Sequence, residues 1–180
     1  ISTANKLGIG EIRKLGKYYP LAIGAYEQTV IDMTAAYAAI TNRGLYFKPS
    51  PFEEIRGPNN SLLWSKSVDG YRGKKVIKDS VADTMNWMLQ EVVKKGSGKA
   101  ARLKRHPVAG KTGTSEEGKD LWFIGSIPQL STGIWFGHDD NRPTDSTSAE
   151  AALAWKKFMS SIESDFKVIN FKKKGFLAME

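Results

Sequence analysis

Residues 107–136 read PVAGKTGTSEEGKDLWFIGSIPQLSTGIWF, and they carry the strongest strand signals of the chain. Residues 121–127 are almost continuously apolar, as in a strand that is buried on both faces. Residues 130–136 alternate in polarity, as in a strand with two different faces. Pro128 and Gln129 lie between them and predict a tight turn, so the two segments should form an antiparallel hairpin. The side chains that share one side of the second strand are Leu130, Thr132, Ile134 and Phe136.

A third strand and a smaller hairpin are predicted around this pair. Residues 107–114 supply the third strand, and the polar loop 115–119 joins it to the first strand of the hairpin. Further upstream, residues 52–55 and 62–65 have the composition of short strands. The sequence Gly57-Pro58-Asn59-Asn60 separates them and is typical of a turn.

Three segments show the apolar spacing of helices. Each begins with a capping-box pattern, a Ser or Thr followed three residues later by an acidic residue: Thr29 with Asp32, Ser80 with Asp83, and Thr147 with Glu150. Gly44 and Gly96 are placed to end the first two helices. The predicted buried faces are Val30, Met33, Tyr37 and Ile40 in the first, Val81, Met85, Met88, Leu89 and Val92 in the second, and Trp155, Phe158, Met159 and Ile162 in the third.

The order of these elements is helix, small hairpin, helix, three-stranded meander, helix. This order predicts an α/β protein of the α+β type, an antiparallel β-sheet with helices packed on it. We expect residues 1–163 to belong to one domain and residues 164–180, which contain Lys172-Lys173-Lys174, to form a basic C-terminal tail.

Composition narrows the possible chemistry. The 180 residues are 41% hydrophobic and 26% charged, which is ordinary for a globular protein. Cysteine is absent, which excludes disulfides and thiol catalysis and weakens any zinc interpretation. The net charge of +8 suits an anionic partner, although a solvated basic surface explains it more simply. No apolar run approaches the roughly 18–20 residues of a membrane span.

The segment Ala109 to Ser115, AGKTGTS, carries the clearest chemical motif. A phosphate-binding loop would need a glycine five positions before the Gly110-Lys111 pair, and Arg105 stands there. The alternative is the Lys-Thr-Gly strand of active-site serine acyl-transferases. A lysine on a strand attracts a substrate carboxylate, and Gly113 on the same face leaves room for a bound peptide.

The surroundings of this motif support the second interpretation. After the motif come DLWFIG from Asp120, PQL from Pro128, GIWFG from Gly133 and DDNRP from Asp139. Together with the segments 21–25 and 29–44, this pattern resembles the transpeptidase domain of class A, bifunctional penicillin-binding proteins over residues 1–163. The resemblance implies the penicillin-binding and β-lactamase-like transpeptidase fold, here incomplete.

The resemblance also implies a function. Such enzymes cross-link peptidoglycan: a serine attacks the D-Ala-D-Ala bond of a stem peptide, and an amine of a second stem resolves the acyl-enzyme. β-Lactams acylate the same serine. By resemblance, Lys111 and Thr114 are catalytic residues, and Lys111, Thr112, Gly113 and Thr114 bind substrate. The Thr114 amide would form half of the oxyanion hole.

The resemblance also implies a location. The expected location is the extracytoplasmic face of the bacterial membrane, with the parent protein anchored by a segment outside this chain. No cofactor and no metal are expected.

Two family motifs are missing. The chain has no Ser-x-Asn, and its one Ser-x-x-Lys, Ser164 to Lys167, follows the Lys-Thr-Gly strand instead of preceding it. We therefore expect the nucleophile in an upstream part of the same domain, which would be an obligatory partner of this chain. Two alternatives stay open: a non-catalytic binding relative of the same fold, and a basic nucleic-acid-binding domain. The aromatic residues fall mainly on apolar faces, which argues against nucleic acid.

Four other kinds of residue have a simple structural interpretation. His138 beside Asp139 hints at a metal site, but without a third ligand at recognisable spacing a loop histidine is the better prediction. Glu116 and Glu117 could contact a cationic stem-peptide amine, although a solvated loop explains them. Trp122 and Trp135 are predicted to be core residues. Ser115 could donate a hydrogen bond or start a turn, and the sequence favours neither role.

Overall fold

The computed structural model describes residues 1–9, 19–24, 26–68 and 71–173. Its main sheet is antiparallel and has the strand order β5-β6-β7, with β5 at Ala109–Thr114, β6 at Leu121–Ile127 and β7 at Leu130–Phe136. The central strand β6 is buried along almost its whole length, as its apolar sequence predicts. The meander and the tight turn between β6 and β7 are therefore confirmed. The antiparallel sheet with packed helices confirms the predicted fold class.

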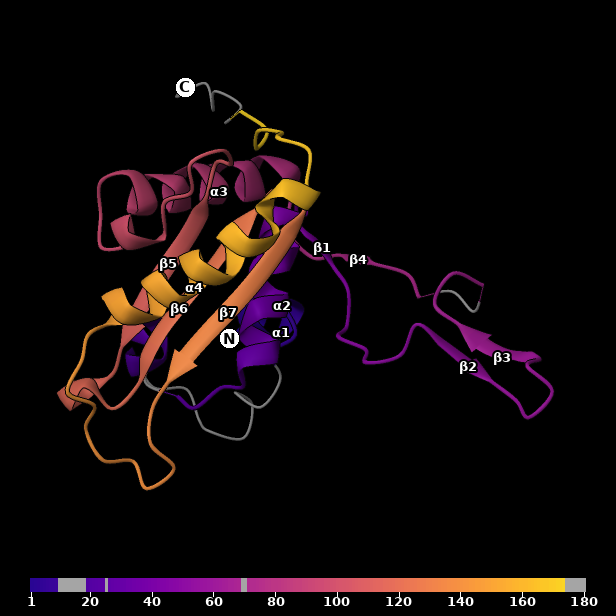
Figure 1. Ribbon diagram of the computed structural model, residues 1–180, viewed down its shortest axis with the longest axis horizontal. Coiled ribbons are helices and arrows are strands. Elements are labelled where there is room, and N and C mark those ends of the chain that lie inside the picture. Colours follow the sequence, from indigo (N-terminus) through magenta and orange to yellow (C-terminus); the bar gives the residue numbers. More distant parts are fainter. Residues whose placement is uncertain (10–18, 25, 69–70, 174–180) are drawn as a thin grey trace.

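Helices cover both faces of this sheet (Figure 1). Helix α4, Ser148–Ile162, crosses one face, while α2, Val30–Thr41, packs on the other face against β6 and β7. Glycines let the helices approach closely. A Cβ at Gly125 would lie 2.7 Å from the Trp155 ring of α4, and one at Gly133 would lie within 2.4 Å of the Thr34 hydroxyl of α2.

The main core lies between the sheet and α4. Phe123 and Ile127 of β6 and Trp155 and Met159 of α4 are fully buried. The rings of Phe123 and Trp155 meet edge to face with centroids 5.4 Å apart, a favourable aromatic geometry. Phe158 is 47% exposed, so its predicted place on the buried face of α4 is wrong. One residue along a helix is a rotation of about 100°, which turns Phe158 away from the face that holds Met159.

Two of the three predicted helix starts are confirmed. The Thr29 hydroxyl accepts a hydrogen bond from the Asp32 amide at 3.1 Å, and the Thr147 hydroxyl accepts one from the Ala149 amide at 3.3 Å. Helix α3, Asp79–Lys94, instead follows Lys78 without a side-chain cap, so the predicted capping box of Ser80 and Asp83 is wrong.

The Asp83 carboxylate has a tertiary partner instead. Arg43 follows α2 with a left-handed φ of 53° and donates two hydrogen bonds to Asp83, at 3.1 and 3.0 Å. The Arg43 guanidinium also lies 3.1 Å from Asp79, and Lys75 bonds both Asp79 and the Arg43 carbonyl. The hydrogen bond from Lys75 and the charge of Arg43 lower the pKa of the Asp79 carboxyl. This network fixes the end of α2 against the start of α3.

Helix α3 packs against β5 and α2, but not with the face that its apolar pattern predicts. Its buried residues are Ala82, Asp83, Asn86, Leu89 and Val93, whereas Val81 and Met88 are almost half exposed. The predicted stripe is therefore confirmed at Leu89 and wrong at Val81 and Met88, while Met85 and Val92 are partly buried. Asn86 donates to the Ile40 carbonyl of α2 at 3.0 Å, and Asp83 bonds Arg43. These polar contacts turn the helix by part of a turn from the orientation that hydrophobicity alone predicts.

The small hairpin is also confirmed. Strands β2, Glu54–Arg56, and β3, Leu62–Ser65, pair in an antiparallel ribbon that extends away from the body of the molecule (Figure 1). Strands β1, Leu45–Tyr46, and β4, Lys74–Lys75, pair at its base and were not predicted. The remaining elements are short helical segments: α1 at Ser2–Lys6, η2 at Tyr19–Ile23, η3 at Lys99–Ala101, η4 at Glu116–Gly118 and η5 at Glu163–Asp165.

The predicted tail begins on the body of the protein. The ring of Phe171 is buried beside Leu89 of α3 and Ala109 of β5. Residues 174–180 of the tail, and Ala25 of the upstream segment, lie outside the described residues. The domain boundary at residue 163 stays a prediction. Over the described ranges, no helix has the length and apolarity to cross a membrane.

Candidate functional site

The candidate site lies on β5, which is an edge strand of the main sheet. The Ser115 amide donates to the Asp120 carbonyl at 3.1 Å, which makes these two residues a hydrogen-bonded pair at the end of the ladder. Hydrogen-bonded and non-hydrogen-bonded pairs alternate along an antiparallel ladder. Thr114 and Leu121 therefore form a non-hydrogen-bonded pair. It follows that the backbone N–H of Thr114 points away from β6, toward the outer edge of the sheet.

Lys111 reaches the same edge. Its Cα pairs with that of Ile124, two pairs from Gly113 and Trp122 on the same face of the sheet. Its ammonium donates to the Thr112 carbonyl at 2.7 Å, and this carbonyl points outward by the same alternation. The ammonium thus bends from its face to the outer edge of β5. The Lys111 ammonium and the Thr114 N–H therefore lie on the same edge of the sheet. Strand alternation alone places the two side chains on opposite faces and could not establish this.

The two threonines have different surroundings. The Thr112 side chain is buried, and its hydroxyl lies 2.6 Å from the hydroxyl of Ser97, which follows α3. Thr114 is exposed. Gly113 is tightly placed as well, because a Cβ there would lie 3.3 Å from the Cβ of Trp122. The Thr112 side chain thus contacts the segment that follows α3, and Gly113 packs against Trp122 of β6.

The loop after Thr114 is held at two points. The Ser115 hydroxyl donates to Asp120 Oδ2 at 2.8 Å and accepts from the Asp120 amide at 2.8 Å, so Ser115 has both of the roles that the sequence left open, donor and start of the turn. The indole N–H of Trp135 donates to Asp120 Oδ1 at 2.9 Å. On the far side of the loop, the Thr144 amide donates to the Gly118 carbonyl at 3.2 Å.

Residues 8–160 match the family model described as "Penicillin binding protein transpeptidase domain". The chain belongs to this family. The transpeptidase chain is 32% identical over 139 residues to Penicillin-binding protein 1A of Aquifex aeolicus, covering 77% of this chain and 18% of that protein. It is 30% identical over 160 residues to Penicillin-binding protein 1B of Vibrio cholerae, covering 84% and 19%.

Solved structures agree with this family. PonA1 of Mycobacterium tuberculosis, a penicillin-binding protein, superposes with a TM-score of 0.87 at 25% identity, over 97% of this chain and 52% of the solved one. The same protein has been solved in complex with penicillin V, with a TM-score of 0.86. The transpeptidase chain therefore spans less than a fifth of these curated relatives and about half of the solved PonA1 chain.

Sequence reasoning missed the contacts that four residues make around the candidate site: Ser97, Asp120, Trp135 and Thr144. Ser97 and Thr144 are brought in by tertiary contacts, with no local signal. The contact of Asp120 with Ser115 could have been predicted from the sequence, because residues at the two ends of a hairpin loop face each other across the ladder. Trp135 is 36% exposed, so the prediction that it is a core residue is wrong. Its indole N–H is polar and finds its partner at the rim of the sheet, on Asp120.

The other residues singled out from the sequence lie in loops and short 3-10 segments. Glu117 pairs with Lys119 at 2.9 Å, and Glu116 is exposed. His138 belongs to a backbone turn in which the Asn141 amide donates to its carbonyl at 2.9 Å. Ser164, of the Ser-x-x-Lys match, lies in η5 directly after α4. In the described parts of the transpeptidase chain, no group of three His, Cys, Asp or Glu residues is arranged to hold a metal.

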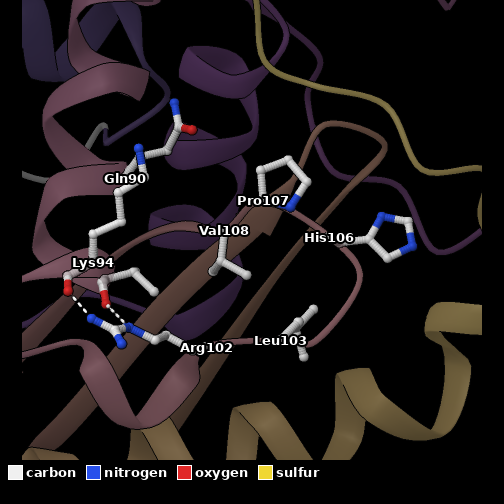
Figure 2. A pocket seen from close by; sticks show the side chains of 8 residues that line it. Gln90, Lys94, Arg102, Leu103, His106, Pro107 and Val108 are labelled. Carbon is white, nitrogen blue, oxygen red and sulfur yellow. Dashed lines mark hydrogen bonds between the residues drawn. The ribbon is translucent and has the colours of Figure 1, made fainter.

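A cavity of about 220 Å³ lies between the end of α3 and the segment before β5 (Figure 2). Arg102 bonds the Val93 carbonyl at 3.0 Å and the Lys94 carbonyl, so it caps the end of α3. The His106 ring in Figure 2 points away from Lys94, and its Nε2 donates to the Glu163 carbonyl at 3.0 Å. The polar groups here connect structural elements, and Lys111 is not among the residues that line the cavity.

Proposed function

We propose that this chain supplies the substrate-carboxylate and oxyanion wall of a D,D-transpeptidase that cross-links peptidoglycan. The observation that carries the proposal is the meeting of the Lys111 ammonium and the outward Thr114 amide on the open edge of β5. A cation fixed beside a free backbone donor suits a peptide that ends in a carboxylate and reacts at a neighbouring carbonyl. The donor substrate is a stem peptide ending in D-Ala-D-Ala.

Each motif residue has a proposed role. Lys111 attracts the terminal carboxylate and keeps the local potential positive. Thr114 donates its hydroxyl to that carboxylate and its amide to the oxyanion. The Thr112 hydroxyl donates a hydrogen bond to the same carboxylate, and its contact with the Ser97 hydroxyl fixes its orientation. Gly113 leaves the face beside the ammonium free of a side chain.

The nucleophile is proposed to be a serine in an upstream part of the same domain. Its Oγ bonds to the carbonyl carbon of the penultimate D-Ala, the C–N bond to the last D-Ala breaks, and that D-Ala leaves with a proton on its nitrogen. An amine of a second stem peptide then attacks the ester and releases the serine. β-Lactams acylate the same serine because their amide carbonyl occupies the oxyanion position. The structure of PonA1 in complex with penicillin V shows that a relative binds a β-lactam.

The remaining proposals concern the whole protein. It is proposed to be a class A penicillin-binding protein, anchored in the bacterial cytoplasmic membrane with this domain on the extracytoplasmic side. Residues 1–163 belong to the transpeptidase domain, and residues 164–180 form its basic C-terminal tail. Nucleic acid is not a proposed partner.

The test of this function uses the complete protein, meaning a polypeptide in which this chain follows the upstream part of the domain. Incubation with a pentapeptide ending in D-Ala-D-Ala and an excess of an amine acceptor should release one D-Ala per cross-linked product. Prior treatment with penicillin should abolish both the release of D-Ala and the formation of the cross-linked product. Chiral amino-acid analysis quantifies the released D-Ala, and mass spectrometry quantifies the cross-linked product. If D-Ala is not released, or if release is insensitive to penicillin, the proposed function is wrong.

A further inference from the structure

We propose that Asp120 is a positioning residue that sets the oxyanion donor of Thr114, and this inference rests on the proposed function. Asp120 lies directly before β6, opposite the end of β5. Both of its carboxylate oxygens are used: Oδ2 accepts from Ser115 at 2.8 Å and Oδ1 accepts from the Trp135 indole at 2.9 Å. One carboxylate thus connects the ends of β5, β6 and β7. We call Ser115, Asp120 and Trp135 the Asp120 clamp.

The clamp acts on the residue that follows the candidate oxyanion donor. Ser115 makes three hydrogen bonds to Asp120: amide to carbonyl, hydroxyl to carboxylate, and amide of Asp120 to hydroxyl of Ser115. These bonds fix the peptide plane and side chain of Ser115. The Thr114 N–H belongs to the peptide plane that it shares with the Gly113 carbonyl, and the pair of Thr114 with Leu121 lies between the hydrogen-bonded pairs of Gly113 with Trp122 and of Ser115 with Asp120. If the Asp120 clamp opens, the outer of these two pairs is lost and β5 can fray from its end as far as Thr114. The direction of the Thr114 N–H therefore depends on the clamp.

The contribution of the Asp120 clamp to the stability of the fold does not explain the clamp well. Ser115 is exposed, and Trp135 is partly exposed, so the clamp buries little apolar surface. Hydrogen bonds at such a rim contribute modestly to stability, since water can replace them. Precise placement of a donor matters far more for catalysis, because an oxyanion donor must lie at about 2.7–3.1 Å from the developing charge. The clamp therefore fits a positioning role at β5.

The deciding experiment measures acylation of the complete protein by a fluorescent penicillin under stopped flow. The noncovalent dissociation constant is separated from the acylation rate constant by varying the penicillin concentration. Asp120→Asn keeps the side-chain shape but removes the charge and replaces one acceptor oxygen by an amide donor, so the Ser115 hydroxyl can no longer donate at that position and both contacts become weaker, neutral ones. We expect the acylation rate constant to fall about tenfold or more, while the noncovalent dissociation constant changes less than about twofold. Only the oxyanion donor is displaced, and Lys111 still binds the carboxylate.

Two further variants keep the test decisive if Asp120→Asn folds poorly. Trp135→Phe removes only the indole donor, and Ser115→Thr retains the hydroxyl. We expect a reduced acylation rate constant for the first and a nearly unchanged one for the second. A purely structural role would lower the fraction of labelled protein and the melting temperature, but would leave the rate constant of the active fraction unchanged.

The two levels of the proposal fail differently. If the unaltered complete protein is not acylated, the proposed function fails and the Asp120 inference fails with it. If the unaltered protein is acylated and both Asp120→Asn and Trp135→Phe react at its rate, the inference about Asp120 is wrong and the proposed function stands.

Discussion

Replacing Lys111 by alanine in the complete protein is expected to slow acylation by penicillin about 100-fold, measured as the second-order rate constant. The ammonium lies at the outer edge of β5, where it donates to the Thr112 carbonyl, and we propose that it binds the substrate carboxylate there. Removing one member of a hydrogen-bonded charge pair in a binding site typically costs about 2–5 kcal/mol, and about 2.7 kcal/mol corresponds to 100-fold.

Lys119 offers a matched control for this variant. It lies in the loop after the same strand and pairs with Glu117 at 2.9 Å, so Lys119→Ala removes the same charge near β5 without touching its edge. We expect this control to react within about twofold of the unaltered protein, because exposed ion pairs contribute little. Equal rates for Lys111→Ala and Lys119→Ala would contradict the role assigned to Lys111.

Replacing Trp155 by alanine is expected to lower the free energy of unfolding by about 3–5 kcal/mol, measured by urea unfolding. Trp155 is fully buried between α4 and the sheet, and its ring contacts Phe123 while Gly125 makes room for it. Truncation leaves a cavity at the centre of the main core. A loss of less than about 1 kcal/mol would show that this core does not hold the sheet and α4 together.

Trp155→Phe is the control for the size of the ring. The indole nitrogen of Trp155 is buried and has no hydrogen-bond partner within the described residues, so phenylalanine loses no polar contact there. We expect it to cost about 1.5 kcal/mol or less, because much of the packing volume is kept. The difference between the free-energy losses of the two variants measures the contribution of the aromatic ring that fills the core. The loss of the nitrogen is common to both variants and cancels in this difference.

The sheet was predictable because its signals are local. The apolar run of β6, the alternation of β7 and the Pro128-Gln129 turn are contiguous, and they define strand order and register together. Strands β1 and β4 were missed because they are two residues each and pair across about thirty residues of chain. A run of two residues carries no periodicity, so only the tertiary structure reveals it.

Helix α3 shows where hydrophobic patterning fails. Its apolar stripe fits Val81, Met85 and Met88, yet the face that packs inward carries Asp83 and Asn86. These two polar residues are buried because Arg43 and the Ile40 carbonyl satisfy them. The partners lie about forty positions away in sequence, so no local pattern could have predicted the rotation.

The candidate site was predictable in part. The sequence predicts the motif from Lys111 to Thr114. It does not predict the edge of the sheet on which the ammonium and the backbone donor of this motif lie. Strand alternation places the lysine and the threonines on opposite faces, and only the edge position of β5 brings the ammonium and the Thr114 amide together. Ser97 on Thr112 and Trp135 on Asp120 needed the folded structure, because they come from different elements.

We propose that this chain carries the substrate-carboxylate and oxyanion wall of the active site and that the nucleophile lies in an upstream part of the domain. Peptide mapping by mass spectrometry after penicillin treatment tests it most directly. In the complete protein, we expect one covalent adduct on a serine upstream of Ile1, and none on any serine of this chain, Ser115 and Ser164 included. A penicilloyl adduct on a serine within residues 1–180 would contradict it.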